Sequence, residues 1–92
     1  MTLLNTFPDN AWTPLESILC PELIGQFMFM GVFRQDGVNI HLYKHIETRK
    51  YINVDTSGQS YIYQPGYGEA GRYDPVPIER IRAQYPGGAK AH

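Results

Sequence analysis

Three groups of residues in this 92-residue sequence have types and spacing that chemistry could use, and the first is a pair of histidines. His41 and His45 are four positions apart, which on a helix would place two metal ligands on one face. The surrounding residues alternate as in a strand, where four positions separate two side chains by about 13 Å, too far to share an ion. No second cysteine or acidic pair completes a ligand set. The sequence therefore predicts no metal site, and it places both histidines on a half-solvated strand.

The second group contains a possible nucleophile and a glycine-rich loop. Cys20 would need a neighbouring base and a third group to orient that base, but it directly precedes Pro21 within an apolar helical stripe, where an inert buried thiol is expected. Gly66, Gly68 and Gly71 resemble a phosphate-binding loop, yet no Lys-Ser or Lys-Thr pair follows them. These patterns predict a protein that is not an enzyme and needs no cofactor.

The third group combines cations with aromatic rings. In the stretch HLYKHIETRK and its continuation, Lys44, Arg49 and Lys50 are interleaved with Tyr43 and Tyr51. Proteins that bind single-stranded nucleic acid use this combination, because the cations contact phosphates and the aromatic rings stack on bases. Against that function, the formal net charge is only -1, so the chain has no global field to attract nucleic acid. Tyrosine and arginine are also enriched at the energetic centres of protein interfaces, which do not need a high net charge.

The first of two predicted hairpins is marked by Asp36-Gly37. The pair lies between two apolar runs, and both residues can adopt the positive φ that a tight two-residue turn requires. The expected pairing joins Gln35 to Val38, Phe33 to Ile40 and Gly31 to Leu42. It predicts one side made of Phe29, Phe33, Val38, Ile40 and Leu42, and an opposite side made of Met30, Val32, Arg34, Asn39, His41 and Tyr43.

The second predicted hairpin turns at Thr56-Ser57-Gly58, where the glycine takes the left-handed position and Asp55 pairs with Gln59. In that register the core positions are Ile52, Val54 and Ile62, and the opposite face carries Arg49, Tyr51, Asn53, Tyr61 and Tyr63. A change of one residue in the register would move the last two tyrosines to the core side, so this assignment depends on the chemistry of the turn.

Short helices are predicted at both ends. Thr13, Pro14 and Glu16 have the pattern of an N-cap, a first helical residue and a capping box, and Pro21 stops that helix. One further turn is predicted over 22–24, ended by Gly25. The segment 64–77 reads as an exposed loop with a short extended stretch near Tyr73, and 78–85 has a helical pattern that ends at 86–88.

The expected fold is α+β: an antiparallel sheet of four or five strands from two hairpins, with one short helix at each end. An SH3-like small barrel is the alternative. At 42% apolar and 13% aromatic residues, the chain is predicted to form a single domain over 1–92, with an ordered body over about 12–86 and a flexible tail over 87–92. The single cysteine, the lack of a secretion signal and the short apolar runs predict a cytoplasmic protein that does not enter a membrane.

The sequence thus favours a non-catalytic module, such as a small inhibitor or accessory protein, that docks a tyrosine-rich sheet face onto a protein partner. Single-stranded nucleic-acid binding through 41–63 is the alternative, and nothing indicates an oligomeric state. The candidate binding residues are Tyr43, Lys44, Arg49, Lys50, Tyr51, Asn53, Tyr61 and Tyr63.

Overall fold

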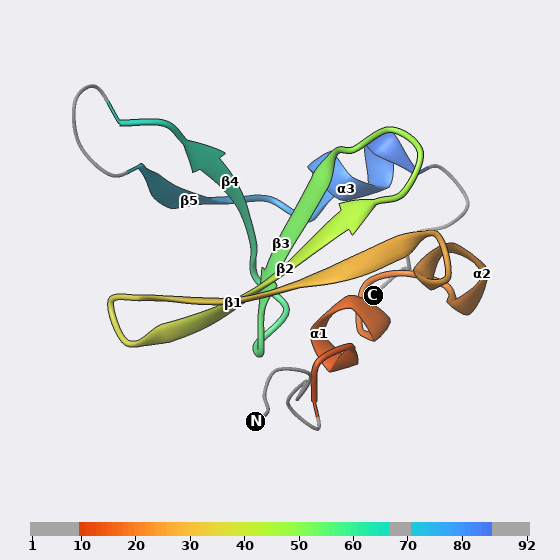
Figure 1. Cartoon of the computed structure of the whole chain (residues 1–92), viewed down its shortest axis with the longest axis horizontal. Coiled ribbons are helices and arrows are strands. Elements are labelled where there is room, and N and C mark those ends of the chain that lie inside the picture. Colours follow the sequence, from red (N-terminus) through yellow and green to blue (C-terminus); the bar gives the residue numbers. More distant parts are fainter. Residues whose placement is uncertain (1–9, 67–70, 86–92) are drawn as a thin grey trace, which may run out of the picture.

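The computed structural model describes residues 10–66 and 71–85, and within them the chain forms an open antiparallel sheet with short helices (Figure 1). The sheet has five strands in the order β1-β2-β3-β4-β5 and is not closed into a barrel, so the α+β prediction is confirmed and the barrel alternative is not what the chain forms. The strands are β1 (Phe27–Gln35), β2 (Val38–His45), β3 (Tyr51–Asp55), β4 (Ser60–Gln64) and β5 (Arg72–Val76), and the helices are α1 (Thr13–Glu16), α2 (Pro21–Ile24) and α3 (Glu79–Gln84).

The first hairpin has the predicted turn and pairing. Asp36 and Gly37 have φ values of 52° and 79°, and Gln35 pairs with Val38 in the β1–β2 ladder. The predicted partners of Phe33 and Gly31 are also confirmed.

A β-bulge in β1 alters which side chains share a face. The pairing shifts by one residue between Phe29 and Gly31, and Gly31 takes a φ of 127°, a conformation that side-chain-bearing residues rarely adopt. Phe29 therefore pairs with Tyr43 and lies on the same side of the sheet as Tyr43, not on the side of Phe33. Met30 lies on the side of Leu42, where both line a groove that is described below. The predicted sides of Phe29 and Met30 are thus wrong, because simple alternation takes no account of the extra residue.

The second hairpin is confirmed near its turn. Gly58 has a φ of 91°, the Asp55 amide donates to the Gln59 carbonyl at 2.9 Å, and Asn53 pairs with Tyr61. The pairing of β3 with β4 covers only two residue pairs, after which β4 continues along β5. Ile62 was predicted for the core, but it lines the same groove as Asn53 and Tyr61.

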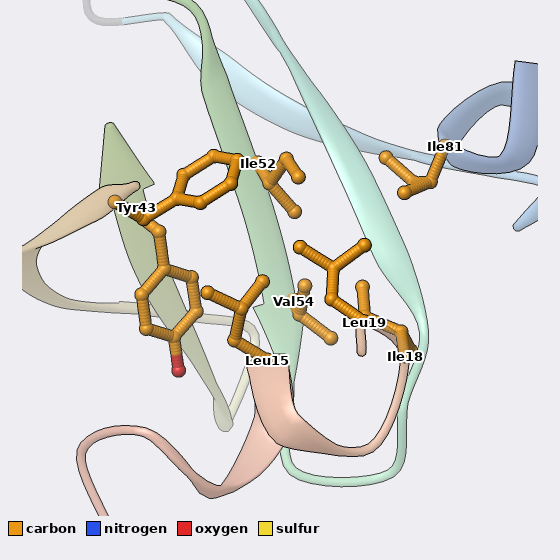
Figure 2. Packing of buried hydrophobic residues seen from close by; sticks show 8 residues of the cluster. Leu15, Ile18, Leu19, Tyr43, Ile52, Val54 and Ile81 are labelled. Carbon is orange, nitrogen blue, oxygen red and sulfur yellow. The ribbon is translucent and has the colours of Figure 1, made fainter. Parts of the chain in front are cut away.

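The pairing between the hairpins decides which face becomes the core. Tyr43 pairs with Ile52 and His41 with Val54, so the end of β2 lies on the same side as the apolar residues of β3. The helices cover this side, called here the covered face (Figure 2). Its buried cluster consists of Leu15, Ile18, Leu19, Phe27, Tyr43, Ile52, Val54 and Ile81. The opposite side of the sheet is called the open face.

The helices follow the predicted order, but α1 is capped differently and ends at Glu16, before the predicted stop at Pro21. Trp12, not Thr13, is the N-cap of α1, and it makes no side-chain capping hydrogen bond; Thr13 is already helical. Ser17 Oγ donates to the Pro14 carbonyl at 2.6 Å. Ile78 precedes α3 as its N-cap, in agreement with the predicted helix, whereas the predicted stop at 86–88 and the tail 87–92 lie outside the described residues. Among the described helices, none has the length and apolar character needed to cross a bilayer.

Candidate binding groove on the open face

The open face carries a groove of about 520 Å³ between β1–β2 on one side and β4–β5 on the other. In Figure 1 the tip of the β1–β2 hairpin and the β4–β5 pair both extend to the left of the view. Among the residues that the structure describes, those that line the groove are uncharged at neutral pH. They are Met30, Leu42, Tyr51, Asn53, Tyr61, Ile62, Tyr63 and Tyr73, and together they are called here the tyrosine groove.

The four tyrosines of the groove come from three neighbouring strands. Tyr51 and Tyr63 are 47% and 49% exposed, and the rings of Tyr63 and Tyr73 lie in tilted contact with centroids 5.1 Å apart. Burial raises the pKa of Tyr73, and the nearby phenols of Tyr63 and Tyr51 raise it further. All three phenols line the groove.

Tyr61 is held in place by the β3–β4 turn. Its hydroxyl donates to Asp55 Oδ2 at 2.8 Å, while Asp55 Oδ1 accepts from Ser57 N, Ser57 Oγ and Gln59 N at 2.8, 2.6 and 3.0 Å. Burial alone would raise the pKa of the Asp55 carboxyl, but these hydrogen bonds together hold it below 3.8. Burial and the Asp55 carboxylate raise the pKa of Tyr61 to about 12. An ionised carboxylate therefore lies directly behind one wall of the groove.

Asn53 is 4% exposed and is the most buried polar residue of the groove lining. Its Nδ2 donates to the Tyr61 carbonyl at 3.3 Å. This contact fixes the orientation of the amide, because Oδ1 is an acceptor and cannot form a hydrogen bond with a carbonyl oxygen. Within the described residues no donor reaches Oδ1. A buried acceptor without a donor costs about 1–3 kcal/mol, so it marks a position where a ligand could contribute binding energy.

Two contacts hold β5 against β1 at the far end of the groove. Gln35 Nε2 donates to the Tyr73 carbonyl at 2.8 Å, and the Tyr73 amide donates to Gln35 Oε1 at 2.9 Å. Phe33 adds a ring contact to Tyr73 with centroids 5.2 Å apart. The Gln35 side chain thus forms hydrogen bonds with the backbone N–H and C=O of Tyr73 in the edge strand β5, and it keeps Tyr73 turned into the groove.

Of the sequence-predicted binding residues, Tyr51, Asn53, Tyr61 and Tyr63 come together in the groove. Tyr43 is 0% exposed on the covered face, where its hydroxyl donates to the Ala11 carbonyl at 2.6 Å, so it takes no part in this surface. Its separation follows from the pairing with Ile52, which neither hairpin alone could predict.

The basic candidates lie beside the groove rather than in it. The Lys44 ammonium is 6.0 Å from the centroid of the Tyr51 ring. Arg49 and Lys50 are exposed in the β2–β3 turn, where Arg49 has a φ of 64° and its amide donates to the His45 carbonyl at 2.9 Å. Within residues 10–66 and 71–85, no line of cations follows the groove, as a phosphate backbone would require.

The two histidines are buried on the covered face, so the prediction that they are surface residues is wrong. His45 Nδ1 accepts from the amides of Glu47 and Thr48 at 3.2 and 3.1 Å, which leaves Nε2 to donate to Gln26 Oε1 at 3.0 Å. His41 Nδ1 lies 3.2 Å from the Ala11 carbonyl, the same acceptor that Tyr43 uses. Over residues 10–66 and 71–85, no three His, Cys, Asp or Glu side chains group to hold a metal ion.

Several residues that line or support the groove were not predicted. An aspartate two residues before Ser57 has the pattern of an Asx turn, a signal that could have identified Asp55. Tyr73 and Gln35 could not have been found in this way, because their contact joins residues 38 positions apart through side-chain geometry. Met30 joins the groove through the bulge.

Comparison with known proteins gives no match to a protein-family model, to a curated protein or to a solved structure. The geometry of the tyrosine groove is therefore the basis on which a function can be inferred.

Proposed function

We propose that this chain is a non-catalytic binding module, an inhibitor or accessory protein, that docks its tyrosine groove onto a protein partner. The observation that carries the proposal is the convergence of Tyr51, Tyr61, Tyr63 and Tyr73 on one uncovered, uncharged groove. Tyrosines supply a large, rigid contact area with a polar end, and such residues dominate the binding energy of protein interfaces.

The surroundings of the groove support the same function. Met28, Met30, Phe33 and Val38 are each at least one-third exposed along the β1–β2 hairpin. Exposed apolar side chains that adjoin a groove are typical of interaction surfaces. The nucleic-acid alternative has weaker support, because the cations at 44, 49 and 50 do not line the groove.

A pair of cross-linking positions tests this proposal. Tyr63 and Ile46 are both 49% exposed, but only Tyr63 lines the groove, whereas Ile46 follows β2 in the β2–β3 turn. A photoreactive phenylalanine analogue at position 63 should give a protein adduct in extracts of the source cell, and the same analogue at position 46 should not. The adduct should survive nuclease treatment and disappear in a Tyr51→Ala background.

The opposite results would overturn the proposal. Equal adducts at both positions would show that the groove is not the interface. Salt-steep binding of labelled oligonucleotides, flattened by Lys44→Ala, Arg49→Ala and Lys50→Ala, would favour the nucleic-acid function, since each phosphate contact adds about -0.7 to the slope of log affinity against log salt.

A further inference from the structure

We infer that the group bound in the tyrosine groove is an arginine side chain of the partner, stacked on the tyrosine rings and donating to Asn53 Oδ1. This inference rests on the proposed function and names the chemistry that the groove recognises. It begins with the amide of Asn53, whose orientation is fixed by the Tyr61 carbonyl and whose oxygen meets no donor among the described residues.

A ligand that satisfies Asn53 must bring an N–H or O–H group into a site lined mostly by aromatic and aliphatic side chains. Oδ1 is covered in the free protein, so the ligand reaches it when a neighbouring side chain of the groove moves aside. The nearly half-exposed rings of Tyr51 and Tyr63 have the freedom to do so. Their hydroxyls, and that of Tyr73, can accept hydrogen bonds from the same ligand.

The charge near the groove favours a cation. None of the described lining residues is charged, but the Asp55 carboxylate accepts the Tyr61 hydroxyl hydrogen bond at 2.8 Å. That bond increases the electron density of the Tyr61 ring, and cations are attracted to the faces of electron-rich rings. Because the ammonium of Lys44 already lies 6.0 Å from the centroid of the Tyr51 ring, the side of the groove left for a second cation is that of Tyr61.

Arginine matches both requirements better than the other groups that aromatic grooves bind. Its guanidinium is planar, stacks on aromatic faces and carries five donors. A proline-rich segment would leave Asn53 Oδ1 without a donor, because proline has no N–H. A trimethylated lysine also has no donor, and a phosphate would find no cation among the lining residues.

The test uses the full ¹⁵N-labelled chain and small probes observed by NMR. N-acetyl-arginine amide should shift the Asn53 side-chain amide signal, with an affinity roughly tenfold above that of N-acetyl-citrulline amide, which corresponds to about 1.4 kcal/mol. Citrulline has nearly the same shape but no charge. N-acetyl-lysine amide and N-acetyl-proline amide complete the controls for charge without planarity and for an apolar ring without a donor.

Two variants locate the effect. Asn53→Leu removes the acceptor while keeping the branched shape of the side chain, and it should lower arginine affinity about tenfold. Because it also removes the donor to the Tyr61 carbonyl, its unfolding temperature is measured beside its affinity. Tyr63→Leu changes a half-exposed side chain, which leaves the fold intact, and it should lower the affinity about fivefold. Unchanged arginine affinity in both variants would overturn the inference.

The outcomes separate this inference from the proposed function. Equal binding of citrulline, lysine or proline at the groove would overturn arginine recognition and leave the groove as a binding site. A cross-link at position 63 without arginine binding would have the same meaning. If neither a probe nor a cross-link reaches the groove, both proposals fail.

Discussion

The two faces of the sheet use tyrosine in opposite ways. On the covered face, Tyr43 is fully buried, its hydroxyl is paired with the Ala11 carbonyl, and burial raises its pKa. On the open face, Tyr63 and Tyr51 leave about half of their surface exposed. The difference shows that the neighbouring strand and the helices decide whether a tyrosine stabilises the fold or forms a surface.

Replacing one tyrosine on each face gives the largest expected contrast. Tyr43→Ala should lower the free energy of unfolding by about 3–5 kcal/mol, since it leaves a cavity in the core. Tyr63→Ala should cost less than about 1 kcal/mol, because its ring is half solvated. Urea unfolding of both variants measures the two values, and equal losses would show that the open face is also part of the core.

The hydrogen-bonded turn behind the groove should produce an acid-sensitive contribution to stability. Asp55→Asn should cost about 1.5–3 kcal/mol at neutral pH, the usual value of hydrogen bonds to a charged group. The pKa of Asp55 is lower in the folded chain than its ordinary 3.8, so the unfolded chain binds more protons as the pH falls. The stabilisation is therefore complete well above pH 3.8 and is lost as the pH falls through the lower, folded pKa.

The corresponding measurement compares unfolding of the original chain and the variant at neutral pH and below pH 3.8. The difference between them should shrink in acid. A difference that stays constant would mean that the Asp55 carboxylate has the same pKa in both states.

Tyr61 supplies the alkaline counterpart: its pKa is raised from 10.0 to about 12, so its contribution to stability is present below pH 10 and is lost as the pH rises toward 12.

Local chemistry predicted both hairpin turns, because a positive φ at Gly37 and Gly58 depends only on the residues at hand. The β1 bulge was missed, since Gly31 reads as an ordinary strand residue until its partners are known. The turns alone do not predict the whole groove. The positions of Asn53 and Tyr61 follow from the register of the second hairpin, whereas the position of Tyr73 depends on its hydrogen bond with the Gln35 side chain. Sequence reasoning therefore found the wall built by one hairpin and not the wall that requires long-range contacts.

The smallest expected effect separates the shape of the open face from its stability. A Cβ at Gly71 would lie 2.5 Å from both the Gln64 carbonyl oxygen and the Tyr63 ring carbon Cζ, so the Tyr63 ring lies over a position that has no room for a side chain. Gly71→Ala should cost about 1–3 kcal/mol, the usual range for overpacking, and should displace the Tyr63 ring. Gly25→Ala is the matched control, because its φ is -64° and no atom lies within 4 Å of the added group.

Thermal unfolding measures the change in stability, and the NMR signals of Tyr63 report the displacement of its ring. The signals of Tyr43, which report the covered face, should not change. If Gly71→Ala leaves the Tyr63 signals in place, the ring does not depend on this glycine, and the groove keeps its shape through the Gln35 contacts with Tyr73 instead.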